Sequence, residues 1–228
     1  MDQRCVRSAR DGATVRGGIV RGSALVLGVC AGLALVAVAV LPAAAAPKSP
    51  GLLLATDLPA TYVGSPPTTS STLNALVVDK AACTETPVPI AGLLDAQSVL
   101  YSRSGSTTPD IVAENVVSFP TAKAARSAFT AQAKSAKVGA TCATVGFVPP
   151  GATAPVSTVA IAKVKASRAG TASFASSAHA TGTSVNSSSV TFLSGPYVVT
   201  VSASAGPDGV SAAALDHAVA VAEKRLSG

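Results

Sequence analysis

Residues 116–129, VVSFPTAKAARSAF, contain the change of period that decides the fold of this chain. Apolar residues alternate up to Phe119, which is typical of a half-buried β-strand, and then recur every three or four residues, which is typical of an amphipathic helix. Thr121 can cap that helix and Gly139 can end it. The stretch therefore predicts a strand followed by a helix over residues 121–138.

The same order of elements occurs again near the C-terminus. An alternating pattern over residues 190–203, with a turn at residues 194–196, precedes a helical stripe over residues 208–226. We expect residues 197–203 to form a strand with one buried and one largely polar face. Two hairpin–helix units imply an α+β fold, an antiparallel sheet with two main helices packed on it. The other expected elements are a hairpin around the turn at residues 104–110, strands at residues 158–166 and 171–180, and a loop at residues 64–72.

A secretory leader is indicated by the first 46 residues. Five arginines precede an apolar run at residues 23–41, and the small residues Ala43, Ala45 and Ala46 follow it. This order of basic, apolar and small residues is typical of a signal peptide, whose basic end stays in the cytoplasm. We expect cleavage after Ala45. The chain would then consist of a signal peptide (residues 1–45) and one secreted or envelope domain (residues 46–228).

Two other fates of the leader compete with cleavage. A retained membrane anchor stays open, because an apolar run of about 18 residues lies at the lower end of the length that spans a bilayer. Contact with a membrane is then expected through the leader alone. Lipidation of Cys30 is disfavoured, because Val29 stands where a small residue is required and most of the apolar run follows.

Cleavage changes the charge of the chain. The leader holds five of the 17 basic residues and two of the 11 acidic ones, so the 183 mature residues carry a net charge of +3 instead of +6. This length suits one domain with its own hydrophobic core. The small charge and the absence of Trp argue against a nucleic-acid partner.

Cys83 and Cys142 are the cysteines that remain after cleavage. An even count in an oxidising compartment indicates a disulfide, and the alternative is two buried free thiols. A link between positions 59 apart would stabilise the fold by about 4 kcal/mol. Neither cysteine has a Cys or His at ligand spacing, so no metal site is expected.

Four basic residues follow one side of the first predicted helix, at offsets of 0, 3, 11 and 14: Lys123, Arg126, Lys134 and Lys137. We call them the basic row. One interpretation is a solvated face that keeps the protein soluble. The other is a contact surface for anionic lipid headgroups or wall polymers, whose binding would be sensitive to salt.

The sequence contains no familiar catalytic or cofactor motif. Zinc-protease, dinucleotide, phosphate-loop and serine-elbow signatures are absent, so neither a cofactor nor an enzymatic activity is expected. His179 and His217 stand alone and are interpreted as a strand residue and a surface residue. Asp110 and Glu114 are interpreted as solvated charges, because strand residues four apart lie too far from each other to share a proton.

The quoted stretch, continued to Cys142, resembles a known family of exported sensor-like domains of actinobacteria, typified by the extracellular domain of PknH-type receptor kinases. Two other segments also resemble this family: LLL at residues 52–54 and GPYVVTV at residues 195–201. It implies an α+β domain with a twisted antiparallel sheet, flanking helices and a ligand-binding cleft. This chain departs from the family in having one cysteine pair where two are implied, no Trp and no kinase domain, so we carry over no binding residue.

These observations favour a non-enzymatic exported binding or sensor-like domain of the cell envelope. Its implied partner is a small molecule, a lipid or a wall polymer. One alternative is an envelope structural or adhesion protein that uses the basic row, and another is an enzyme of unrecognised type.

Overall fold

The computed structural model describes residues 51–58, 61–104, 110–166, 172–180, 185–205 and 212–226. The predicted leader, with Ala43, Ala45 and Ala46, lies outside the described residues. The elements in chain order are η1 (Ala55–Asp57), β1 (Tyr62–Gly64), β2 (Thr68–Ser70), β3 (Asn74–Asp79), β4 (Thr84–Pro89), β5 (Asp95–Arg103), β6 (Ile111–Ser118), α1 (Ala122–Gly139), β7 (Val145–Phe147), β8 (Ser157–Ala166), β9 (Ser173–Ala180), β10 (Asn186–Ser194), β11 (Tyr197–Ala205) and α2 (Ala212–Leu226).

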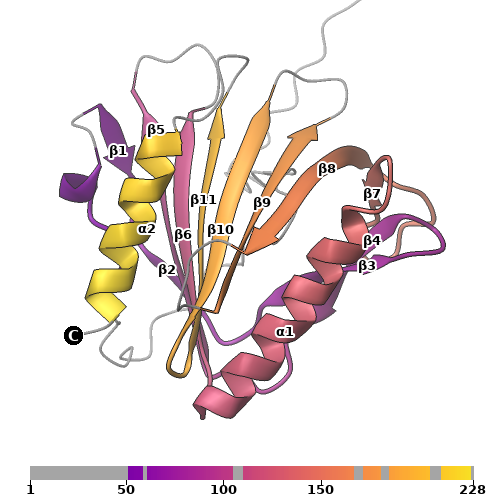
Figure 1. Cartoon of the computed structure of the whole chain (residues 1–228). Helices are drawn as coiled ribbons and strands as arrows, with labels where there is room; N and C mark the ends of the chain where they lie inside the picture. Colours follow the sequence, from indigo (N-terminus) through magenta and orange to yellow (C-terminus); the bar gives the residue numbers. More distant parts are fainter. Residues whose placement is uncertain are drawn as a thin grey trace, which may run out of the picture.

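The strands form one large sheet in the order β1-β5-β6-β11-β10-β9-β8-β7-β4-β3, with β2 also paired to β5. Among the described strands, only β4 and β7 pair in parallel. Figure 1 shows the twisted sheet with its two helices; α2 packs on β10 and β11, and α1 packs on β3, β10 and β11. The expected fold class, a mostly antiparallel α+β sheet with two main helices and one disulfide, is confirmed.

Both predicted hairpin–helix units are present. β5 pairs with β6 ahead of α1, and β10 pairs with β11 ahead of α2. Ser194 lies opposite Tyr197, so the second hairpin closes with a two-residue turn. Gly195 takes a φ of +54° in it, a value that favours glycine at the first central position of such a turn. β6 and β11 are neighbours, so the two units meet at the centre of the sheet.

The expectation that residues 197–203 have only one buried face is wrong. Val198 and Thr200 are buried, and so are Val199 and Val201 on the other face. The reason is that β11 lies between β6 and β10, with a packing cluster on each face. The Thr200 hydroxyl contacts the hydroxyl of Thr191 at 3.0 Å, which satisfies a polar group in the interior.

The two helices pack on opposite faces of the central strands. The cluster around α2 contains Val116 and Val199, whereas the cluster around α1 contains their neighbours Val117 and Val198. Consecutive residues of a strand point to opposite faces, which fixes this arrangement. Each central strand is therefore buried by a helix on either side.

The first helix begins where the sequence predicts. Thr121 is its N-cap, and the Thr121 hydroxyl accepts a hydrogen bond of 3.1 Å from the amide of Ala124. In the part of the chain that the structure describes, no helix combines the length and the apolar character that a membrane crossing needs.

The loop predicted at residues 64–72 contains a short strand. β2 pairs with β5, with Thr68 opposite Ser98 and their hydroxyl oxygens 2.6 Å apart. Its residues are exposed or half-buried, so backbone pairing with its neighbour, and no apolar pattern, holds β2 in place.

Candidate functional site

An open groove of about 470 Å³ lies between the β3–β4 turn and the C-terminal half of α1. We call it the lysine groove. Two of its lysines come from α1 and the third comes from the turn. It is lined by Lys80, Thr130, Ala133, Lys134, Lys137, Val138 and Thr141.

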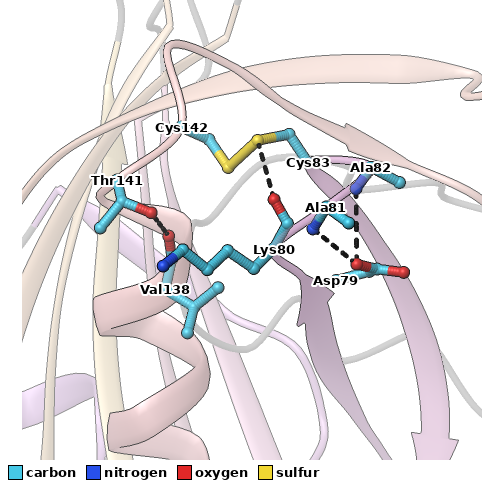
Figure 2. The surroundings of a disulfide bond; sticks show 8 residues. All are labelled: Asp79, Lys80, Ala81, Ala82, Cys83, Val138, Thr141 and Cys142. Carbon is cyan, nitrogen blue, oxygen red and sulfur yellow. Dashed lines mark hydrogen bonds between the residues drawn. A yellow bond between two sulfur atoms is a disulfide. The ribbon is translucent and has the colours of Figure 1, made fainter.

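The β3–β4 turn places Lys80 against the end of α1. One carboxylate oxygen of Asp79 accepts hydrogen bonds from the amides of Ala81, at 2.7 Å, and Ala82, at 3.4 Å. In Figure 2 the Lys80 side chain extends from this turn toward Val138. The turn thus adds the positive charge of Lys80 to the two positive charges that α1 supplies.

A disulfide braces the two walls of the lysine groove. Cys83 and Cys142, which the sequence predicts to pair, are bonded, with their Cα atoms 5.9 Å apart (Figure 2). Cys83 follows Lys80 by three residues, and Cys142 directly follows Thr141. The covalent link therefore limits how far the β3–β4 turn can move from the end of α1.

The C-terminal carbonyls of α1 already have hydrogen-bond partners. The Val138 carbonyl accepts from the Thr141 amide at 3.0 Å and from the Thr141 hydroxyl at 2.7 Å. The Gly139 carbonyl accepts from the Cys142 amide at 3.0 Å. A helix C-terminus carries partial negative charge, which repels anions. These hydrogen bonds reduce that repulsion for an anion in the groove.

The charged side chains that line the groove are all lysines. None of the described residues that line it is acidic. Within the described ranges, Lys80, Lys134 and Lys137 form no ion pair, whereas Arg103 with Asp110 and Arg225 with Asp57 do. Such an arrangement can hold an anion.

All four residues of the basic row are exposed on α1. Lys134 and Lys137 line the groove, and Lys123 and Arg126 lie nearer the start of the helix, outside it. Sequence reasoning missed Lys80. The signal was the cysteine pair, because a disulfide from Cys83 to Cys142 brings residue 80 close to the end of α1.

A second cluster holds the N-terminal segment, residues 51–58, against the sheet. The Leu53 amide donates to Glu114 Oε2 at 2.6 Å, and the Tyr101 hydroxyl donates to the Leu53 carbonyl at 2.7 Å. Arg225 of α2 donates to the Leu52 carbonyl and pairs with Asp57, with a closest N–O distance of 2.7 Å. We call these contacts the N-terminal clamp.

Glu114 is fully buried, so its interpretation as a solvated charge is wrong. Burial raises the pKa of Glu114 to about 7, against the lowering effects of the Leu53 hydrogen bond and the Arg225 charge. Its Oε1 atom is buried without a hydrogen-bond partner among the described residues. Asp110, the other member of the pair, accepts a hydrogen bond of 2.7 Å from the Tyr62 hydroxyl.

The remaining titratable candidates do not assemble a catalytic set. His179 is exposed and its Nδ1 lies 2.9 Å from an amide oxygen, Oδ1 of Asn186, while His217 is exposed on α2. Glu85 is buried, and burial raises its pKa to about 7. Among the described residues, no group of three His, Cys, Asp or Glu side chains could hold a metal ion.

Comparison with known proteins gives a likeness of fold. No protein-family model and no curated protein sequence matches the chain. Among solved structures, it is similar to the extracellular domain of PknH from Mycobacterium tuberculosis, with a TM-score of 0.54 and 20% sequence identity, covering 78% of this chain and 93% of that chain. The resemblance seen in the sequence is thus confirmed at the level of the fold.

Proposed function

We propose that this chain is a non-enzymatic exported domain that binds a ligand and acts as a sensor-like module of the cell envelope. The lysine groove carries the proposal, because its two walls are cross-linked and its three lysines form no ion pair among the described residues. The fold shared with an extracellular domain of a receptor kinase supports it. A disulfide also fits an oxidising compartment outside the cytoplasm.

Native mass spectrometry of the exported protein tests whether it binds a ligand. We expect a non-covalent adduct of defined mass, either copurified or formed with added lipids or wall fragments. The absence of any adduct across these candidates would contradict the proposal. Turnover of any of them would instead point to an enzyme.

We propose that the leader directs export and is cleaved after Ala45. The expected mature sequence begins Ala46-Pro47. N-terminal sequencing of the protein recovered outside the cytoplasmic membrane decides between this outcome and a retained anchor, whose N-terminus would lie before the apolar run.

A second candidate function is structural attachment to the envelope through the basic row. The observation in its favour is that all four side chains are exposed along α1. Replacing Lys123, Arg126, Lys134 and Lys137 by Glu should then release the protein from the envelope fraction. Unchanged association with the envelope fraction after this charge reversal would contradict the adhesion hypothesis.

A further inference from the structure

The lysine groove combines positive charge with an apolar lining. Ala133 and Val138 lie among the ammonium-bearing side chains. The hydroxyl of Thr130 donates to the Arg126 carbonyl at 2.8 Å, and that of Thr141 donates to the Val138 carbonyl. Both threonine hydroxyl protons are therefore donated to backbone carbonyls of α1. A ligand with one anionic part and one apolar part would use the whole lining, whereas a small inorganic ion would use only the charges.

We infer that the lysine groove binds the phosphate headgroup of an anionic lipid at a membrane surface. This rests on the proposed function, for which it names the ligand class. Lysine binds phosphate as a point charge and does not need the fork geometry of arginine. The groove volume of about 470 Å³ falls within the range of small-ligand sites, roughly 300–1,000 Å³. It has room for a headgroup, while the acyl chains stay in the bilayer.

The rest of the basic row argues for a surface over a soluble phosphate. Lys123 lies 14 residues before Lys137 on the same side of α1, which corresponds to about 21 Å along the helix. One soluble phosphate cannot reach both ends of that row, but a plane of headgroups can. Lys80 and Lys134 would then hold one headgroup with Lys137, and Lys123 and Arg126 would lie against its neighbours.

The test measures binding of the exported protein to vesicles of phosphatidylglycerol and phosphatidylcholine, with pure phosphatidylcholine vesicles as the neutral reference. The groove variant is Lys80→Gln with Lys134→Gln and Lys137→Gln. Each basic residue near an anionic surface raises affinity about fivefold. We therefore expect the triple variant to bind anionic vesicles roughly 100-fold more weakly, with its melting temperature unchanged. Unchanged affinity would overturn the inference.

A matched control removes the same charge elsewhere. It combines Lys123→Gln, Arg126→Gln and Lys224→Gln, all at exposed positions outside the groove. Because Lys123 and Arg126 lie against neighbouring headgroups and Lys224 is on α2, it should lose only about 25-fold, which is about fivefold less than the groove variant. Equal losses would mean that diffuse positive charge, and not the groove, binds the surface.

Soluble glycerol phosphate provides the arm that separates a lipid from a free phosphate. Binding of this compound without binding to anionic vesicles would overturn the lipid assignment. Native mass spectrometry separates this inference from the proposed function. If the groove variant still forms the adduct, the protein is a binding domain as proposed, but the groove is not its binding site.

Discussion

Replacing Glu114 by Gln should remove a pH dependence from the stability of the fold. The Glu114 side chain is fully buried, and desolvation raises its pKa from 4.5 to about 7. At about 1.4 kcal/mol per pH unit, this difference corresponds to about 3 kcal/mol. Gln keeps an oxygen that can accept the hydrogen bond from the Leu53 amide, and it cannot ionise.

The sign follows from the direction of the pKa change. Because the pKa is higher in the folded state, the folded protein binds more protons between pH 4.5 and 7, and stability falls as the pH rises through that window. The contribution of Glu114 is fully present below about pH 4.5 and is lost above about pH 7. The wild type should therefore lose about 3 kcal/mol more than Glu114→Gln between pH 4.5 and 8.

Urea unfolding of both proteins across this pH range measures the difference. Glu85, whose pKa burial also raises to about 7, titrates in the same window but is present in both proteins, so its effect cancels. Any constant cost of the buried Gln amide also cancels between pH values. A difference in unfolding free energy that stays constant from pH 4.5 to 8 would refute the reasoning.

Three further substitutions test how the fold is held together. Replacing Cys83 and Cys142 by Ala should cost about 4 kcal/mol in urea unfolding and weaken vesicle binding; a loss under 1 kcal/mol would show that the link adds little. Arg225→Ala removes contacts to Leu52 and Asp57 and should cost about 2 kcal/mol. It should speed hydrogen exchange of residues 51–58 but not of α1, and equal effects on both would contradict the clamp. Thr121→Ala should lower stability by about 1 kcal/mol, with Thr121→Ser near wild type.

Local pattern was enough to predict the elements that carry strong periodicity. α1 and the β10–β11 hairpin were predictable because cap, turn and apolar spacing agree within each segment. β3 and β4 were not predicted, although residues 75–78 of β3 form a short apolar run that is typical of a strand. β4 contains Pro87 and Pro89, which argue against a strand. They are tolerated because β7 pairs only with Thr84 and Glu85, so β7 forms no backbone hydrogen bonds with the prolines on that side of β4.

The site residues that were missed depend on contacts between distant parts of the chain. Glu114 lies in a strand with Ala113 and Asn115 beside it, and nothing local distinguishes it from a solvated carboxylate. Its burial arises from the N-terminal segment, 61 residues away at Leu53. Lys80 likewise lies in the same groove as Lys137 because of a turn and a disulfide. Its place in the groove therefore depends on tertiary structure.

The lysine groove and the N-terminal clamp belong to different packing clusters. Glu114 and Arg225 hold the segment that packs with the α2 cluster, whereas the groove lies on α1 beside the cluster that contains Cys83 and Cys142. Sites without shared partners usually contribute independently to stability. Glu114→Gln should therefore change the pH dependence of unfolding and leave the affinity for anionic vesicles within about twofold of wild type. An altered affinity in this variant would show that the two sites are coupled through β6 and β11.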